Sequence, residues 1–134
     1  MNAVDTNVLI YACDQAHPRE QKLALDLIAG LTDGVLLWQV ACEFVAAARK
    51  LADLGFTAGH AWARLAEFRE LLPLRVPTAP ILERARILHL EQRWSYWDAM
   101  IVAACLDAGV TRLYSEDEPG RTPPAGLEIV NPFA

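Results

Sequence analysis

The feature of this chain that most constrains its fold is a regular alternation of short apolar segments with longer helical patterns. Five short runs have the composition of buried strands, and they cover residues 2–5, 35–38, 74–76, 111–115 and 128–130. Between them, apolar residues recur at helical spacing over residues 7–12, 18–29, 39–54, 57–71, 80–93 and 97–108. Parallel strands need crossover connections, which helices usually supply. The sequence therefore predicts an α/β fold of three layers, with a central, mainly parallel sheet between helices.

The length of the chain bounds its organisation. A chain of 134 residues can enclose one hydrophobic core but is too short for two, so we expect a single domain over residues 1–134. The apolar run at residues 35–40 is far shorter than the roughly 18 residues of a membrane span. Met1 leads directly into a strand-like segment, without a basic start typical of a signal sequence. We therefore expect a cytoplasmic protein with no membrane contact.

The cysteines argue against a disulfide framework or a CxxC metal site, and the charges argue against a general nucleic-acid binder. Cys13, Cys42 and Cys105 are odd in number and widely separated, and we expect reduced thiols that pack as small apolar groups. The net charge of −5 argues against a general nucleic-acid binder, because neutralising phosphates needs clustered Lys and Arg. Basic pairs such as Arg49 with Lys50 are expected on the solvated surface. Any RNA site must therefore be local.

Two acidic residues follow predicted strands. Asp5 ends the strand at residues 2–5, and Asp117 lies just after the strand at residues 111–115. Asp5 alone can be explained as a helix N-cap, and Asp117 alone as part of a solvated turn. In open parallel sheets, however, ligands bind outside the carboxyl ends of the strands, where both residues should emerge. The sequence therefore predicts that the two carboxylates lie at one place.

Two further acids belong to predicted helices. Glu43 sits in a helix that is apolar almost all round, so its carboxylate must be paired, neutralised or bound to a cation. Asp98 opens the helix at residues 97–108, where it can either cap the helix or bind a ligand. If the four acids converge, their repulsion is tolerable chiefly around a divalent metal ion. Oxygen ligands suit Mg²⁺ or Mn²⁺ rather than zinc, and the three histidines show no metal-ligand spacing.

Four short motifs follow one another along the chain: Asp-Thr-Asn-Val-Leu at residues 5–9, a mid-chain helical Glu at position 43, Ser-Tyr-Trp-Asp-Ala-Met-Ile at residues 95–101, and Leu-Tyr-Ser-Glu-Asp at residues 113–117. In this order they resemble those of PIN domains, and in particular those of the VapC toxins of type II toxin–antitoxin systems. The resemblance runs nearly end to end. Together, the four motifs within so short a chain are strongly specific for this family.

The resemblance implies a function and a set of site residues. It implies Mg²⁺- or Mn²⁺-dependent endonucleolytic cleavage of transfer or ribosomal RNA, inhibition by a cognate VapB-like antitoxin, and a homodimer or a toxin–antitoxin hetero-oligomer. Its implied metal-binding and catalytic acids are Asp5, Glu43, Asp98 and Asp117, and its implied supporting residues are Thr6, Asn7 and Ser115. An additional acid follows Asp117, so Glu116 or Glu118 is an alternative for the fourth position.

Other functions fit the sequence less well. Phosphoryl transfer through an aspartyl phosphate would need a second Asp where this chain has Asn7, or a late strand-end Lys, and its only lysines are Lys22 and Lys50. A catalytically inert PIN-like binding module remains the alternative, although all four acids are present. We expect the aromatic helix start at residues 94–97 to pack on the core rather than to stack on RNA bases.

Overall fold

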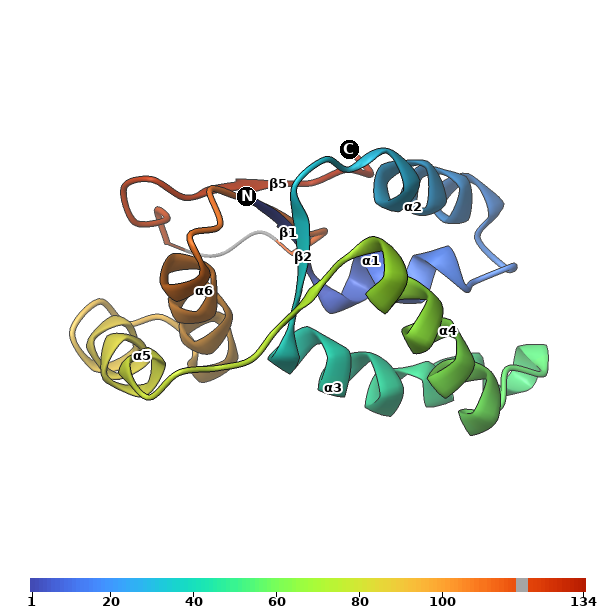
Figure 1. The fold of residues 1–134 in the computed structure, drawn as a ribbon, viewed down its shortest axis with the longest axis horizontal. Helices are drawn as coiled ribbons and strands as arrows, with labels where there is room; N and C mark the ends of the chain where they lie inside the picture. Colours follow the sequence, from blue (N-terminus) through green and yellow to red (C-terminus); the bar gives the residue numbers. More distant parts are fainter. Residues whose placement is uncertain (118–120) are drawn as a thin grey trace.

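A parallel sheet runs through the centre of the protein. The computed structural model describes residues 1–117 and 121–134. Within these residues the strands pair in parallel in the order β3-β2-β1-β4-β5 (Figure 1). Their bounds are β1 (Asn2–Val4), β2 (Gly34–Leu37), β3 (Leu74–Arg75), β4 (Arg112–Tyr114) and β5 (Glu128–Val130). The predicted parallel sheet is therefore confirmed.

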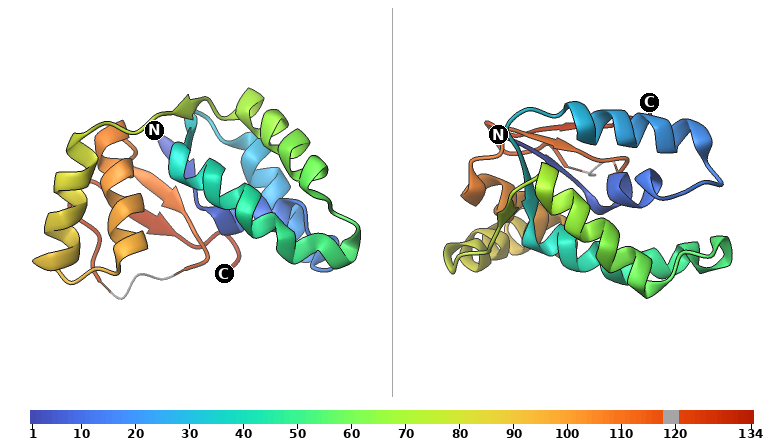
Figure 2. Two further views of the ribbon diagram at one scale, coloured as in Figure 1. Left: turned by 90° about the horizontal axis from the view of Figure 1, so that it is seen from below. Right: turned by 45° about the vertical axis from the view of Figure 1, so that its right-hand side comes forward.

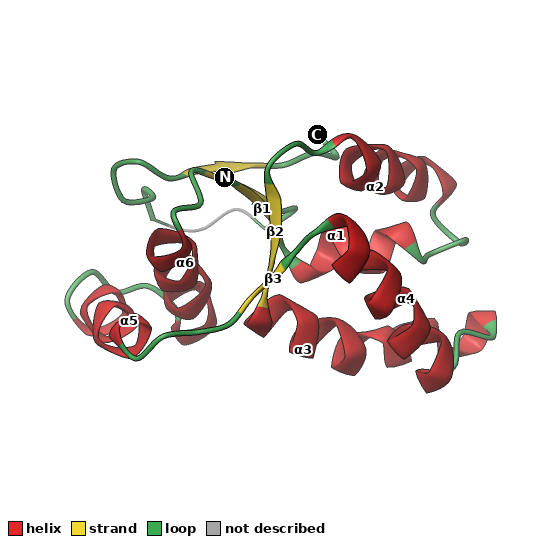
Figure 3. Cartoon of the chain, viewed as in Figure 1, coloured by secondary structure: helices red, strands yellow, loops and turns green. Residues whose placement is uncertain are grey.

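Helices cover both faces of this sheet. Figures 1 and 2 show α5 and α6 on one side and α1 to α4 on the other, and Figure 3 shows the strands between them. The helix bounds are α1 (Thr6–Ala12), α2 (Pro18–Gly30), α3 (Trp38–Ala47), α4 (Ala58–Leu71), α5 (Pro80–Leu90) and α6 (Tyr96–Ala108). The predicted three-layer α/β/α architecture is confirmed. Among the described helices, none is both long and apolar enough to cross a membrane.

The sheet brings two distant segments to one edge. Strands β1 and β4 are parallel neighbours, with Val4 opposite Tyr114. The amide of Asp5 donates a 2.8 Å hydrogen bond to the carbonyl of Tyr114, so the pairing continues past the end of β1. The chain builds the sheet outward in opposite directions from β1, which makes the β1–β4 boundary a topological switch point. Asp5 and Ser115 therefore emerge side by side where a ligand site is expected.

The helix predicted at residues 39–54 is the main difference in secondary structure. Helix α3 ends at Ala47, and a 3-10 segment, η1 (Ala48–Leu54), completes the stretch. The segment ends at Gly55 with a φ of 79°, a left-handed conformation that favours glycine. The stop at Gly55 is as predicted. The change to 3-10 geometry is not readable from the apolar pattern, because both helix types keep residues three apart on one face.

Burial confirms most of the expected core and corrects three positions. Phe44 of α3 and Phe68 of α4 are buried and meet edge to face, with ring centroids 5.5 Å apart. Cys42 is exposed, contrary to the expectation of a packed thiol, because it lies on the side of α3 that faces a cavity. Trp94 is buried as expected, whereas Tyr96 and Trp97 are 49% and 64% exposed. Those two residues therefore do not pack on the core.

Candidate metal centre

Asp5 occupies the centre of the site and is also a helix cap. Its carboxylate accepts a 2.7 Å hydrogen bond from the amide of Thr6 at the start of α1. Its second oxygen accepts a 2.8 Å bond from the hydroxyl of Ser115, which follows β4. The expected N-cap role is confirmed. It leaves room for a second role, because a carboxylate has about four lone-pair sites and these bonds use two of them.

Ser115 and Asn7 tie the segment after β4 to helix α1. The buried Ser115 hydroxyl also accepts bonds from the amide of Asp117 at 3.1 Å and the side-chain amide of Asn7 at 3.3 Å. Asn7 accepts a 3.2 Å bond from the amide of Glu116 and donates a 3.4 Å bond to the carboxylate of Asp117. These bonds hold Asp117 over the end of the sheet. Thus Asn7 and Ser115 have the geometry of supporting residues.

Glu43 reaches the site from helix α3. One of its carboxylate oxygens accepts a 2.8 Å bond from the hydroxyl of Thr6, and the other a 2.9 Å bond from the side-chain amide of Gln39. Both donors are neutral, and in the described part of the chain no ion pair includes Glu43. The prediction that this carboxylate must be paired, neutralised or bound to a cation stays a prediction, because the two hydrogen bonds come from neutral groups. The helix is less enclosed than its sequence suggests, because Glu43 is only partly buried.

Asp98 belongs to the first turn of α6 but does not cap it. The cap is Ser95, whose hydroxyl accepts a 3.3 Å bond from the amide of Asp98. No hydrogen bond to the Asp98 carboxylate occurs among the residues described. The alternative explanation of Asp98 as a helix cap is therefore wrong, because the residue three positions earlier already serves as the cap.

The four acids line two adjoining hollows. A small recess of about 20 Å³ is lined by Asp5, Asp98 and Asp117, together with Ser115. A cleft of about 900 Å³ is lined by Asp5, Glu43 and Asp117, together with Thr6 and Asn7. Asp5 and Asp117 belong to both. The small recess of about 20 Å³ has room for one ligand the size of a water molecule.

The burial and the charges of the site shift the pKa of Asp5. Burial raises the pKa of its carboxyl above the ordinary value, and the charges of Glu43 and Asp117 raise it further. The hydrogen bonds from Ser115 and from the amide of Thr6 lower the pKa and oppose part of this effect. The ionised site therefore carries unrelieved negative charge. A bound cation would relieve it.

The donor set fits a hard divalent cation. Asp5, Glu43, Asp98 and Asp117 offer only carboxylate oxygens, which Mg²⁺ and Mn²⁺ prefer. Over residues 1–117 and 121–134, however, no three acidic, His or Cys side chains are drawn together closely enough to hold one ion. The chemistry of these four side chains nevertheless fits such an ion. Glu118, an alternative to Asp117, lies outside the described residues.

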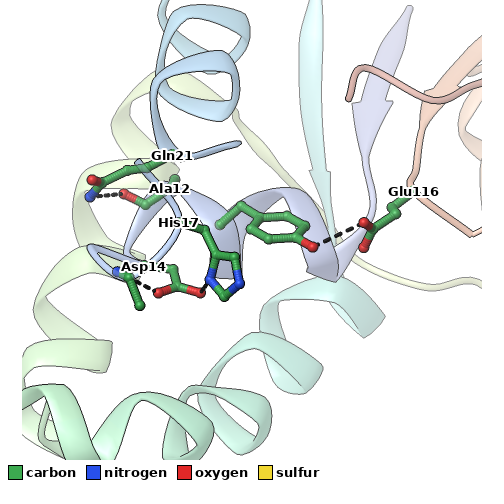
Figure 4. A network of polar contacts seen from close by, with 7 residues as sticks. Ala12, Asp14, His17, Gln21 and Glu116 are labelled. Carbon is green, nitrogen blue, oxygen red and sulfur yellow. Dashed lines mark hydrogen bonds and ion pairs between the residues drawn. The ribbon is translucent and has the colours of Figure 1, made fainter. Parts of the chain in front are cut away.

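The cleft also contains Tyr11, Asp14 and His17, which the sequence analysis did not identify. Asp14 is buried, and its carboxylate lies 2.7 Å from Nδ1 of His17. The hydroxyl of Tyr11 donates a 2.9 Å bond to Glu116 (Figure 4). All four residues line the same cleft as Asp5. The spacing of Asp14 and His17 just before Pro18 was the only sequence signal for this pair. His17 is exposed, and we do not propose it as a metal ligand.

Comparisons with known proteins agree with this fold. The PIN domain family model matches the chain over residues 3–119, so the chain belongs to this family. The fold is similar to the crystal structure of Mycobacterium tuberculosis VapC20, which is described as a Sarcin-Ricin loop cleaving toxin. That likeness has a TM-score of 0.63 and 22% identity, covering 87% of this chain and 90% of that chain. No curated protein matches the chain.

Proposed function

We propose that this protein is a Mg²⁺- or Mn²⁺-dependent endoribonuclease that acts as a VapC-type toxin. The observation that carries the proposal is the placement of four carboxylates, from β1, α3, α6 and the end of β4, around two adjoining hollows at the switch point. Membership of the PIN family and the shared fold with a toxin that cleaves the Sarcin-Ricin loop support the same function.

Asp5, Glu43, Asp98 and Asp117 would hold the metal, each through carboxylate oxygens. When bound, a divalent ion supplies an acidified water and stabilises charge on the phosphate. The chain's own residues orient the ligands: Thr6 and Gln39 fix both oxygens of Glu43, and Ser115 fixes Asp5. Asn7 holds Asp117 in place. Such hydrogen bonds to ligand carboxylates set their direction before a metal arrives.

The proposed reaction is hydrolysis of one phosphodiester bond. The oxygen of water bonds to phosphorus, the bond from phosphorus to the 3′ oxygen breaks, and a proton from water ends on that 3′ oxygen. The products then carry 5′-phosphate and 3′-hydroxyl ends. The 2′-hydroxyl of the RNA is not the nucleophile, and no histidine pair is needed for the reaction.

The proposed substrate is a transfer or ribosomal RNA in the cytoplasm, and the proposed partner is a cognate VapB-like antitoxin. An antitoxin that inhibits by occupying this site would offer Arg or Lys to its carboxylates, because the site is rich in negative charge. The protein would act as a homodimer or within a toxin–antitoxin hetero-oligomer. If the purified complex bound Mn²⁺ as well as the free protein does, this mode of inhibition would be excluded.

The function can be tested by mapping the ends of the products. Purified protein is incubated with total transfer and ribosomal RNA in Mn²⁺ or in EDTA, and the products are ligated with an enzyme that requires 5′-phosphate. We expect Mn²⁺-dependent fragments that ligate, and cleavage should persist with 2′-deoxy at the cut position. Cyclic-phosphate ends, or cleavage in EDTA, would contradict the mechanism. Absence of any cleavage together with binding of a protein partner would favour the inert PIN-like module.

A further inference from the structure

Trp97 is an unusually exposed aromatic residue beside the carboxylates. Its side chain is 64% exposed, although it belongs to the first turn of a helix whose later residues are largely buried. Trp94, three residues earlier, is only 4% exposed and fills the role in the core that the sequence predicted for both. The core therefore does not explain Trp97.

The position of Trp97 relates it to the proposed site. It directly precedes Asp98, which lines the small recess with Asp5 and Asp117. Trp97 itself lines the 900 Å³ cleft that contains Asp5 and Glu43. It also lines a second cavity of about 790 Å³, whose walls are mainly apolar. The indole thus stands at the boundary between the carboxylates and an apolar space.

Neighbouring aromatic rings brace the indole. The ring of Tyr96 lies edge-on to Trp97 at a centroid distance of 4.9 Å, and His89 lies edge-on to Tyr96 at 6.0 Å. Because the ring is already restrained, ordering it on a ligand costs less entropy than ordering a free side chain. Trp97 therefore has the properties of a rigid platform.

The same cleft offers contacts for a charged backbone. Arg49 and Lys50 of η1 are both exposed and line it, although the protein as a whole carries a net charge of −5. A ligand in this cleft would meet two cations, the proposed metal site and an exposed aromatic ring. Phosphates suit the cations and the metal, and flat bases suit the aromatic ring. Single-stranded RNA has both, and proteins bind it by stacking its unpaired bases on aromatic side chains.

From this arrangement we propose that Trp97 is a stacking platform for an unpaired RNA base next to the cleaved phosphate, with Arg49 and Lys50 contacting the backbone. This inference rests on the proposed function. It makes Trp97 a substrate-binding residue that needs an unpaired base, since a base within a duplex cannot reach the ring.

Two binding measurements test the platform. Affinity for a fluorescein-labelled single-stranded RNA of about 12 nucleotides is measured by anisotropy at several salt concentrations, with Ca²⁺ in place of Mg²⁺. We expect Trp97→Ala to weaken binding roughly 5- to 100-fold, with an unchanged salt dependence. Lys50→Ala should instead lower the slope of log Kd against log salt by about one. Trp97→Phe, which keeps a ring, should bind within a few-fold of wild type.

Trp62 provides a matched control. It is 61% exposed on α4, and it lines neither cavity that Trp97 lines. Trp62→Ala should bind RNA as wild type does. Intrinsic fluorescence adds a second readout: RNA should quench the wild-type signal, and most of this quenching should disappear in Trp97→Phe but remain in Trp62→Phe.

Several outcomes would overturn the platform without touching the proposed function. These are wild-type RNA affinity in Trp97→Ala, equal losses in the Trp62 and Trp97 variants, or quenching by RNA that is unchanged in Trp97→Phe. Absence of RNA binding by wild type would overturn the platform and would also count against the proposed function. If the exposure of Trp97 to solvent fell as the protein concentration rose, without RNA, Trp97 would be assigned to a protein interface instead. The proposed function is judged separately, by Mn²⁺-dependent cleavage with wild-type protein.

Discussion

Two cavities of similar size share a wall on this protein, and they differ in chemistry. The carboxylate cleft, of about 900 Å³, is lined by residues that follow β1 and β4 and by one side of α3. The apolar cavity, of about 790 Å³, is lined by side chains of α3, α5, α6, the end of β2 and the β3 segment, among them Leu37, Trp38, Leu74, Val76, Ile81 and Met100. Glu43, Ala46 and Trp97 belong to both.

The difference between the cavities shows where chemistry arises in this fold. An apolar cavity with few polar groups is the usual first choice for a small-molecule site. Here the neighbouring cleft is the better candidate, because two of its carboxylates, Asp5 and Asp117, follow the adjacent parallel strands β1 and β4. The apolar cavity has an acid of its own, Asp107, but Thr78 already donates a 2.8 Å hydrogen bond to it.

The largest expected effect is on RNA cleavage. Asp5→Asn and Glu43→Gln should each lower the Mn²⁺-dependent rate on the order of 10²-fold or more, because they remove ligands of the proposed metal. Asp107→Asn is the matched control, since it removes an acid from the apolar cavity alone. It should retain the wild-type rate, measured by single-turnover gel assays. A comparable loss in Asp107→Asn would show that the two cavities do not differ in function.

The next effect is on thermal stability and its pH dependence. Since the pKa of Asp5 is raised above its ordinary value of 3.8, ionising this group destabilises the folded state. The penalty is absent below that value, develops as the pH rises through the raised pKa, and is complete above it. Saturating Mn²⁺ should offset it and raise the Tm at neutral pH by on the order of 5 °C or more.

Melting curves with and without Mn²⁺, at neutral pH and near pH 4, check this prediction. The shift should be lost near pH 4, where protons compete with the ion for Asp5. At neutral pH, Asp107→Asn should keep the shift and Asp5→Asn should lose it. A shift of equal size in wild type and Asp5→Asn would place the metal elsewhere.

A smaller effect concerns the helix cap beside the site. Ser95→Ala should cost about 1 kcal/mol of unfolding free energy, because it removes the N-cap of α6. Thr57→Ala removes the cap of α4, which lies outside both cavities, at a similar cost. Urea denaturation measures both. Only Ser95→Ala should also reduce cleavage, several-fold, since it loosens the turn that presents Asp98. Equal cleavage activity in the two variants would show that the Ser95 cap does not support the proposed metal site.

The smallest expected effect concerns the reactivity of the cysteines. Burial raises the pKa of Cys105 to about 12, and the charge of Asp5 adds to this effect. At pH 8 its thiolate is therefore a fraction of about 10⁻⁴, and the thiol is also closed to solvent. A maleimide should label the exposed Cys42 first and Cys105 only after unfolding, as read by mass spectrometry. Labelling of native Cys42→Ser at Cys105 would show that the core beside Asp5 opens.

The sequence by itself determined the fold class and most element positions. Apolar residues repeat at helical spacing between short buried runs, and this pattern depends on local chemistry that needs no knowledge of neighbours. The same reasoning placed Asp5 and Asp117 at one edge, since all parallel strands end on the same side. Their proximity is seen at Ser115, whose hydroxyl donates a bond to the Asp5 carboxylate and accepts one from the amide of Asp117.

Only the tertiary structure decided which faces are covered. Trp94 and Trp97 have the same side-chain chemistry and lie three residues apart, yet one is buried and the other is open to both cavities. Periodicity groups residues on a face but cannot say whether another element packs there. The same holds for the exposed Cys42 and for the bond from Thr6 to Glu43, which joins residues 37 positions apart. Long-range packing sets these contacts, because each depends on where a distant segment comes to lie.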